Sequence, residues 1–164
     1  MAAGAYDDLY RQHMSSAGLI PYRVSEGPLE ILIAHPGGPF WARRQEGAWS
    51  IIKGEVPPGE NPLDAAIREF REETGWTVTT VHPIPLGEVR QKAGKEIVAW
   101  AFEADFDPET LTGDTVTLTV RGREVTFPEI DEVRWCARTE AEQLLNPAQS
   151  VYYERLNAAL GTRR

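Results

Sequence analysis

The sequence predicts one domain in which helices cover a mixed β-sheet, an α/β or α+β sandwich. The chain has 164 residues, which is enough to bury a core within a single domain. Helical and strand-like segments alternate irregularly along it, and several predicted strands are joined by short hairpin turns. Because hairpins make neighbouring strands antiparallel, this pattern disfavours a doubly wound parallel sheet.

The first half of the chain is expected to begin with two strands and a long loop. Residues 17–24 and 29–35 are apolar and rich in β-forming residues, and the turn-forming residues between them predict a strand pair. Residues 36–49 form a Gly/Pro-rich loop that carries aromatic residues and two arginines. The density of Pro and Gly over 54–62 predicts that this stretch has no regular structure.

The second half combines hairpins with two helices. Its predicted strands are 77–91 and 95–106 around a turn at 92–95, a hairpin over 115–127 about Arg121 and Gly122, and a short strand over 132–137. A helix over 139–145 is expected to follow, because Thr139 and Glu142 have the spacing of a capping box. Residues 147–160 predict a closing amphipathic helix.

The central helix is the most unusual element, because it gathers acidic residues. It is expected to start near Pro62, which suits a first helical turn, and to end at Gly75, a common stop signal. At about 100° per residue its apolar residues form one face, made of Leu63, Ala66, Ile67, Phe70 and Thr74. Glu69, Glu72 and Glu73 fall on the opposite face.

Carboxylates this close either hold protons or require a counter-charge. Mg²⁺ or Mn²⁺ would suit them, since hard cations prefer oxygen ligands. A solvated helix face with an Arg68–Glu72 ion pair is the alternative explanation for these residues when they are considered alone.

The residues before this helix favour the metal site. Residues 54–76, GEVPPGENPLDAAIREFREETGW, fit the spacing G-x5-E-x7-R-E-U-x-E-E-x-G-U, where U is apolar. The chain therefore resembles the Nudix hydrolases, although Trp76 stands where a smaller aliphatic residue is usual. Residues 49–60 resemble the W-x-x-P-K-G-x-x-x-x-G-E segment of members that act on dinucleoside polyphosphates, with Ile52 in place of the proline. The similarity covers roughly residues 16–145.

This resemblance implies a Nudix-type α/β/α sandwich with a mixed central β-sheet. It also implies hydrolysis of a pyrophosphate bond in a nucleoside diphosphate linked to a second group, with Mg²⁺ as cofactor and Mn²⁺ as a substitute. The implied metal ligands are Glu69, Glu72 and Glu73, completed or supported by Glu60 and the carbonyl of Gly54. Arg68 is expected to orient a neighbouring carboxylate.

The general base is less well defined by the sequence. A glutamate of the motif or a carboxylate from a later loop fits the family pattern. Among the later acids Glu129 is preferred, because it lies just ahead of the predicted strand at 132–137, and Glu103 and Asp114 are alternatives. An ordinary loop carboxylate explains Glu129 equally well.

Several residues are candidates for substrate binding. Lys53, next to Gly54, is expected to meet a phosphate, and Trp41, in the loop with Phe40, to contact a nucleobase. A basic group in the 92–95 turn region is expected to bind the far end of a polyphosphate, and consists of Arg90, Lys92 and Lys95. Surface lysines and solubilising charges are the competing explanations. His35 is expected to be structural.

Charge and composition limit the function classes. The chain has 17 basic and 25 acidic residues, a net charge of −8, which argues against a general nucleic-acid binder. It does not exclude a small phosphate ester, because bound divalent metal can reverse the sign of a site. A single cysteine, Cys136, excludes an internal disulfide and a zinc–cysteine cluster.

The sequence thus predicts a cytoplasmic pyrophosphohydrolase that binds no membrane. Residues 1–13 are expected to be a leader left by cloning, followed by one Nudix domain over 14–164. Dinucleoside polyphosphates are the preferred substrates, modified nucleoside triphosphates the second choice, and diphosphoinositols a distant third. A catalytically silent nucleotide-binding module is the hypothesis from another class, and a homodimer is compatible with all of them.

Overall fold

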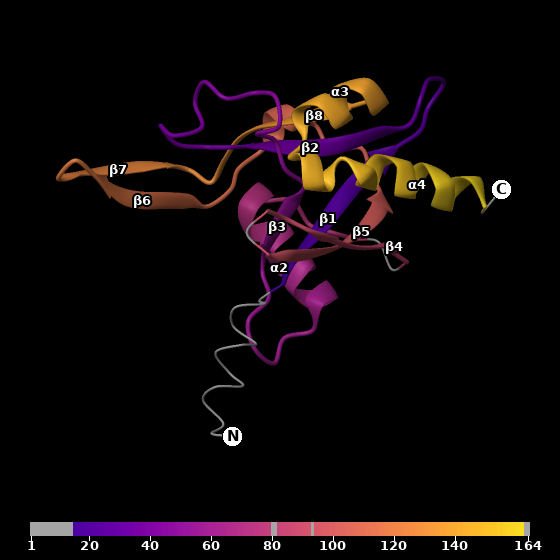
Figure 1. Ribbon diagram of the computed structural model, residues 1–164, viewed down its shortest axis with the longest axis horizontal. Helices are drawn as coiled ribbons and strands as arrows, with labels where there is room; N and C mark the ends of the chain where they lie inside the picture. The colour runs from indigo at the N-terminus through magenta and orange to yellow at the C-terminus, as the bar shows by residue number, and fades with distance from the viewer. Residues whose placement is uncertain (1–14, 80–81, 93, 163–164) are drawn as a thin grey trace.

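The computed structural model describes residues 15–79, 82–92 and 94–162, and Figure 1 shows their arrangement. The predicted leader at 1–13 lies outside the described residues. Among the described residues, no helix is long and apolar enough to cross a membrane.

A mixed sheet forms the centre of the molecule. Its strands are β1 (Ser16–Arg23), β2 (Glu30–Pro36), β3 (Ile52–Glu55), β4 (Ile84–Arg90), β5 (Glu96–Glu103) and β8 (Ile130–Cys136). They lie in the order β4-β5-β1-β2-β8, and β3 pairs with β1 beside this row. Only β1 and β5 pair in parallel, whereas the other pairs are antiparallel, which confirms the predicted mixed sheet.

Helices cover both faces of this sheet. They are α2 (Pro62–Thr74), α3 (Arg138–Leu144) and α4 (Val151–Gly161), with 3-10 turns at Pro108–Thr110 and Pro147–Gln149. Figure 1 shows α2 on one side of the strands and α3 and α4 on the other. Successive strand residues point to opposite faces, so Leu19 packs in the core with Phe70 of α2, and Ile20 in the core with Tyr152 of α4. The α/β/α sandwich is therefore confirmed.

Strand β1 is shared by two neighbours along one edge. Its first half pairs with β3, where Ala17 lies opposite Gly54, and its end pairs with β2, where Tyr22 lies opposite Ile31. The prediction of no regular structure over 54–62 is therefore wrong for its first two residues. Gly54 is held by the sheet, and β3 packs against α2.

Strands β6 (Thr115–Val120) and β7 (Arg123–Pro128) form a separate hairpin that projects from the sandwich (Figure 1). Arg121 and Gly122 have φ values of 51° and 77°, the positive values that a two-residue type I′ hairpin turn requires at both positions. The hairpin predicted at these residues is confirmed.

Three local predictions differ from the structure. The strand expected over 77–91 begins only at Ile84, directly after Pro83, which has no N–H group to donate. Helix α3 has Ala137 at its N-cap with no capping side chain, so the capping box is wrong. The closing helix is split, because its first residues form the 3-10 turn and α4 starts at Val151.

Candidate active site

Helix α2 is fixed at both ends by local chemistry. The Asn61 side chain accepts hydrogen bonds from the backbone N–H groups of Leu63, at 2.9 Å, and Asp64, at 3.4 Å, and Pro62 occupies the first turn. Gly75 ends the helix with φ at 77°, in the left-handed region, and its N–H bonds the Arg71 carbonyl at 2.8 Å. The helix therefore begins and ends where the sequence predicts.

The acidic face of α2 is not uniformly exposed. Glu73 is only 9% exposed, although periodicity places it with Glu69 and Glu72 on the outward face. The side chains of Glu69 and Glu72 are 19% and 45% exposed. The prediction that all three carboxylates point away from the fold is therefore wrong for Glu73, which lines a cavity together with Lys53 of β3 and Glu129.

Glu69 lies directly over Gly54 of β3. A Cβ atom at Gly54 would come within 2.1 Å of the Glu69 carboxyl carbon, so only glycine leaves room for this side chain. The contact explains in physical terms why a motif glycine and a motif glutamate fifteen positions further along the chain are needed together. It also brings the Gly54 backbone next to the carboxylates.

Arg68 binds three of the acids at once. Its Nε donates to Glu60 at 3.1 Å, and its Nη1 donates to Glu69 at 3.0 Å and to Glu72 at 3.2 Å. Among the described residues, no group of three His, Cys, Asp or Glu side chains is arranged to hold a metal ion together. In this arrangement the guanidinium is the counter-charge for these three carboxylates.

The donor set nevertheless suits a hard divalent cation. Burial, together with the negative charges of Glu129 and Glu69, raises the pKa of Glu73 to about 8. A carboxyl group that burial and neighbouring negative charge keep protonated can ionise when a cation binds beside it. The surrounding donors are oxygens, the ligands that Mg²⁺ and Mn²⁺ prefer.

Glu129 and Lys53 meet Glu73 in one cavity of about 140 Å³, which Pro36 and Ser50 also line. Burial raises the pKa of Glu129, and the negative charge of Glu69 adds to the effect. Burial lowers the pKa of Lys53, against the opposing attraction of Glu73. Two residues that the sequence places far apart therefore face the same carboxylate.

The loop 107–114 links Glu129 to the end of α2, a contact that the sequence analysis, which considered only Asp114 of this loop, did not predict. The N–H groups of Thr112 and Asp114 bond the carbonyls of Thr74 and Glu72 at 3.0 and 2.9 Å, which satisfies carbonyls that the helix end leaves open. The Glu129 N–H bonds the Asp114 carbonyl at 3.0 Å.

Gly113 is the residue that permits this approach. A Cβ there would lie 1.9 Å from the Glu73 carbonyl oxygen, too close for any other residue. A lone glycine in a loop carries no sequence signal of this kind, because the atom that it must avoid belongs to a distant helix.

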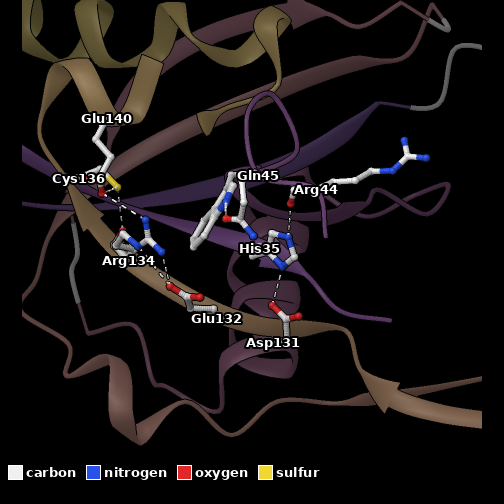
Figure 2. A network of polar contacts seen from close by, with 9 residues as sticks. His35, Arg44, Gln45, Asp131, Glu132, Arg134, Cys136 and Glu140 are labelled. Carbon is white, nitrogen blue, oxygen red and sulfur yellow. Dashed lines mark hydrogen bonds and ion pairs between the residues drawn. The ribbon is translucent and has the colours of Figure 1, made fainter. Parts of the chain in front are cut away.

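The loop 36–49 is anchored beside the cavity by His35. Its Nδ1 lies 2.7 Å from Asp131 of β8, and its Nε2 lies 2.7 Å from the Arg44 carbonyl (Figure 2). Figure 2 shows the His35 ring between these two partners, while the Arg44 side chain extends away from it. The ring is 3% exposed, so the structure gives His35 the structural position that the sequence predicts.

The same loop presents aromatic rings. Trp41 is half-buried and meets Phe40 edge-on with ring centroids 5.0 Å apart, and the Arg44 guanidinium lies 4.1 Å from the Phe40 ring centroid. Trp41 does not line the cavity that contains Glu129, and a nucleobase contact for it stays a prediction.

The predicted basic group lies at the β4–β5 end of the sheet. Arg90 is ion-paired with Glu96 at 2.8 Å, and Lys92 is exposed. The charge of Lys95 contributes to the lowered pKa of Lys53, so Lys95 lies within electrostatic range of the cavity. A direct contribution of Arg90 or Lys92 to the site is not visible among the described contacts.

Comparison with known proteins identifies the same family from a family model and from individual relatives. Residues 13–156 match the family model described as NUDIX domain. An RNA pyrophosphohydrolase of Rhodospirillum rubrum is 30% identical over 157 residues, which cover 90% of this chain and 91% of that protein. The asymmetrical bis(5'-nucleosyl)-tetraphosphatase of Rattus norvegicus is 37% identical over 67 residues, 37% of this chain and 46% of its own length.

Solved structures agree on the fold. The crystal structure of a C. elegans Ap4A hydrolase binary complex superposes with a TM-score of 0.66 at 22% identity, covering 90% of this chain and 99% of that chain.

Proposed function

Because the chain belongs to the Nudix family of hydrolases, which act on pyrophosphate bonds, we propose that it cleaves a phosphoanhydride bond in a dinucleoside polyphosphate. The observation that carries the proposal is the cavity in which Glu73, Glu129 and Lys53 meet beside the other acids of α2. The printed name of the rat relative supports the choice of substrate class.

Divalent metal is the proposed cofactor, with Mg²⁺ preferred and Mn²⁺ as a substitute. Glu69, Glu72 and Glu73 would hold it, supported by Glu60 and the carbonyl of Gly54. Bound metal supplies screening of the anionic phosphates and a more acidic water. Arg68 would orient the carboxylates that it binds, a positioning role.

The other residues of the site have roles in proton transfer and substrate binding. Glu129 accepts a proton from the attacking water, whose oxygen bonds to phosphorus while the bond to the leaving phosphate breaks. Its raised pKa makes it a stronger base than an ordinary carboxylate. Lys53 holds a substrate phosphate, and Trp41 stacks on a nucleobase. Arg90 and Lys92 remain predicted contacts for distal phosphates.

A second candidate substrate is the triphosphorylated 5′ end of an RNA. The relatives named RNA pyrophosphohydrolase support it, because one matches over 90% of this chain. The net charge of −8 disfavours a long RNA partner, which places dinucleoside polyphosphates first. Modified nucleoside triphosphates, a silent nucleotide-binding module, a homodimer and a cytoplasmic location stay predictions.

One substrate panel tests the proposal. Purified protein is incubated with Mg²⁺ and, separately, with diadenosine tetraphosphate, ATP, an oxidised nucleoside triphosphate or a 5′-triphosphorylated oligonucleotide, and the products are resolved. We expect the highest kcat/KM on diadenosine tetraphosphate and no turnover with EDTA. Glu73→Gln is expected to lower kcat by about 10²- to 10⁴-fold. Absence of turnover on the whole panel would support the binding module instead.

A further inference from the structure

A second and larger hollow lies on the outer side of α2. Its volume is about 630 Å³, and its walls are α2, through residues such as Asp64, Ile67, Arg71 and Glu72, and residues 112–114 of the adjoining loop. Glu73 lines the inner cavity and Glu72 lines this groove, so consecutive residues of α2 border the two spaces. A molecule that crosses the acidic cluster would therefore enter the groove.

Arg71 is the cation available in this groove. Arg68 also lines it, but three acids bind that guanidinium. Arg71 is exposed, and no side-chain hydrogen bond or ion pair joins it to another residue within 15–79, 82–92 and 94–162. Arg71 lies in the last turn of α2, but it is not needed to cap the helix. The N–H groups of Thr112, Asp114 and Gly75 already donate hydrogen bonds to carbonyls of that turn.

The groove has the size and chemistry of a nucleotide site. Ligand sites of small molecules enclose roughly 300–1,000 Å³, a range that includes this groove. A guanidinium binds phosphate through charge-assisted hydrogen bonds. Asp64 and Asp114 offer carboxylates of the type that accept hydrogen bonds from ribose hydroxyls, and Ile67 offers an apolar surface to a base.

The geometry points to this groove as the binding site for the second nucleoside 5′-phosphate of a dinucleoside polyphosphate, with Arg71 as the residue that binds its phosphate. The inference rests on the proposed function, since only a substrate with a nucleoside on each side of the cleaved bond occupies both spaces. Arg71 is better suited to this role than Arg90, because Glu96 already neutralises Arg90.

The test compares two substrates in one variant. In Arg71→Ala, kcat/KM for diadenosine tetraphosphate is expected to fall about 10- to 100-fold, mainly through KM, because the variant loses a charge-assisted hydrogen bond to the bound phosphate. For ATP, which lacks the second nucleoside, kcat/KM should stay within about twofold of wild type. Arg71→Lys should recover part of the loss, because lysine keeps the charge without the planar fork.

Arg123→Ala is the matched control, an exposed arginine of the projecting hairpin with no side-chain partner in the part of the chain that is described. It should leave both substrates unchanged, and melting temperatures should show that all variants fold. Equal losses on both substrates, or no loss on diadenosine tetraphosphate, would overturn the inference while the proposed function stands. A selective loss on a 5′-triphosphorylated oligonucleotide alone would assign the groove to RNA and overturn it too. Wild type that does not cleave diadenosine tetraphosphate would remove the proposed function and the inference together.

Discussion

Replacing Glu73 by glutamine should stabilise the metal-free protein. In the unfolded chain this carboxyl ionises near its ordinary pKa of 4.5, whereas burial and neighbouring charges raise its pKa to about 8 in the fold. Between these values the folded state retains a proton that the unfolded state releases, so the free energy of unfolding falls as pH rises. The stability that the protonated Glu73 carboxyl gives to the fold is fully present below pH 4.5, and it is lost above about pH 8.

The size of the effect follows from the same two values. A pH of 7.5 is three units above the pKa of the unfolded carboxyl. At about 1.36 kcal/mol per unit, the free-energy cost of keeping Glu73 protonated in the fold approaches 4 kcal/mol. Glutamine cannot ionise in either state and escapes this penalty. Glu73→Gln should therefore unfold with a free energy up to about 4 kcal/mol higher at pH 7.5, but within about 1 kcal/mol of wild type at pH 5.

Urea denaturation in EDTA at the two pH values measures this difference. Glu72→Gln is the control, because Glu72 is 45% exposed and its ion pair with Arg68 should contribute less than about 1 kcal/mol. Adding Mg²⁺ should stabilise wild type more than Glu73→Gln. If Glu73→Gln is no more stable than wild type at pH 7.5, or gains as much at pH 5, the account of Glu73 as a buried and crowded carboxyl is refuted.

Three further predictions concern the same site and its support. Mg²⁺ should displace the proton of Glu73, so its apparent affinity, measured by calorimetry, should rise up to about tenfold per pH unit until pH 8; a flat profile would contradict this. Gly54→Ala should lower kcat by about 10²-fold in steady-state assays, because the new methyl group displaces the Glu69 carboxylate; unchanged kcat would count against that contact. Trp76→Val should lower the free energy of unfolding by about 1–3 kcal/mol in urea, because it removes a ring stacked 4.5 Å from Phe106; an unaltered midpoint would show that the stack contributes nothing.

Sequence alone identified the features that depend on local chemistry. The span of α2 follows from Asn61 and Pro62 at its start and Gly75 at its end, and the projecting hairpin follows from a turn that suits Arg121 and Gly122. The grouping of strands by hairpins was also sufficient to predict a mixed sheet. The helix ends and the hairpin turn are set by residues that are close in the chain, whereas the parallel pair of β1 and β5 joins distant ones.

The missed features depend on residues that are far apart. Helical periodicity gives the direction of Glu73 but not what covers it, and here Lys53 of β3 and Glu129 line the cavity in which it is buried. The pairing of β3 with β1 was hidden by the prolines that follow it. Arg71 occupies a variable position of the motif, so only the groove beside it gives a reason to examine it.

The projecting hairpin enters and leaves the fold at a single point. Asp114 and Glu129 stand at its two ends and are hydrogen-bonded to each other, so the separation of these residues is fixed beneath the hairpin rather than by it. Lengthening or shortening residues 115–128 in register would change how far the hairpin projects. The carboxylates of Asp114 and Glu129 at its base would stay in place. The reach of the hairpin and the spacing of Asp114 and Glu129 are thus set by separate parts of the chain.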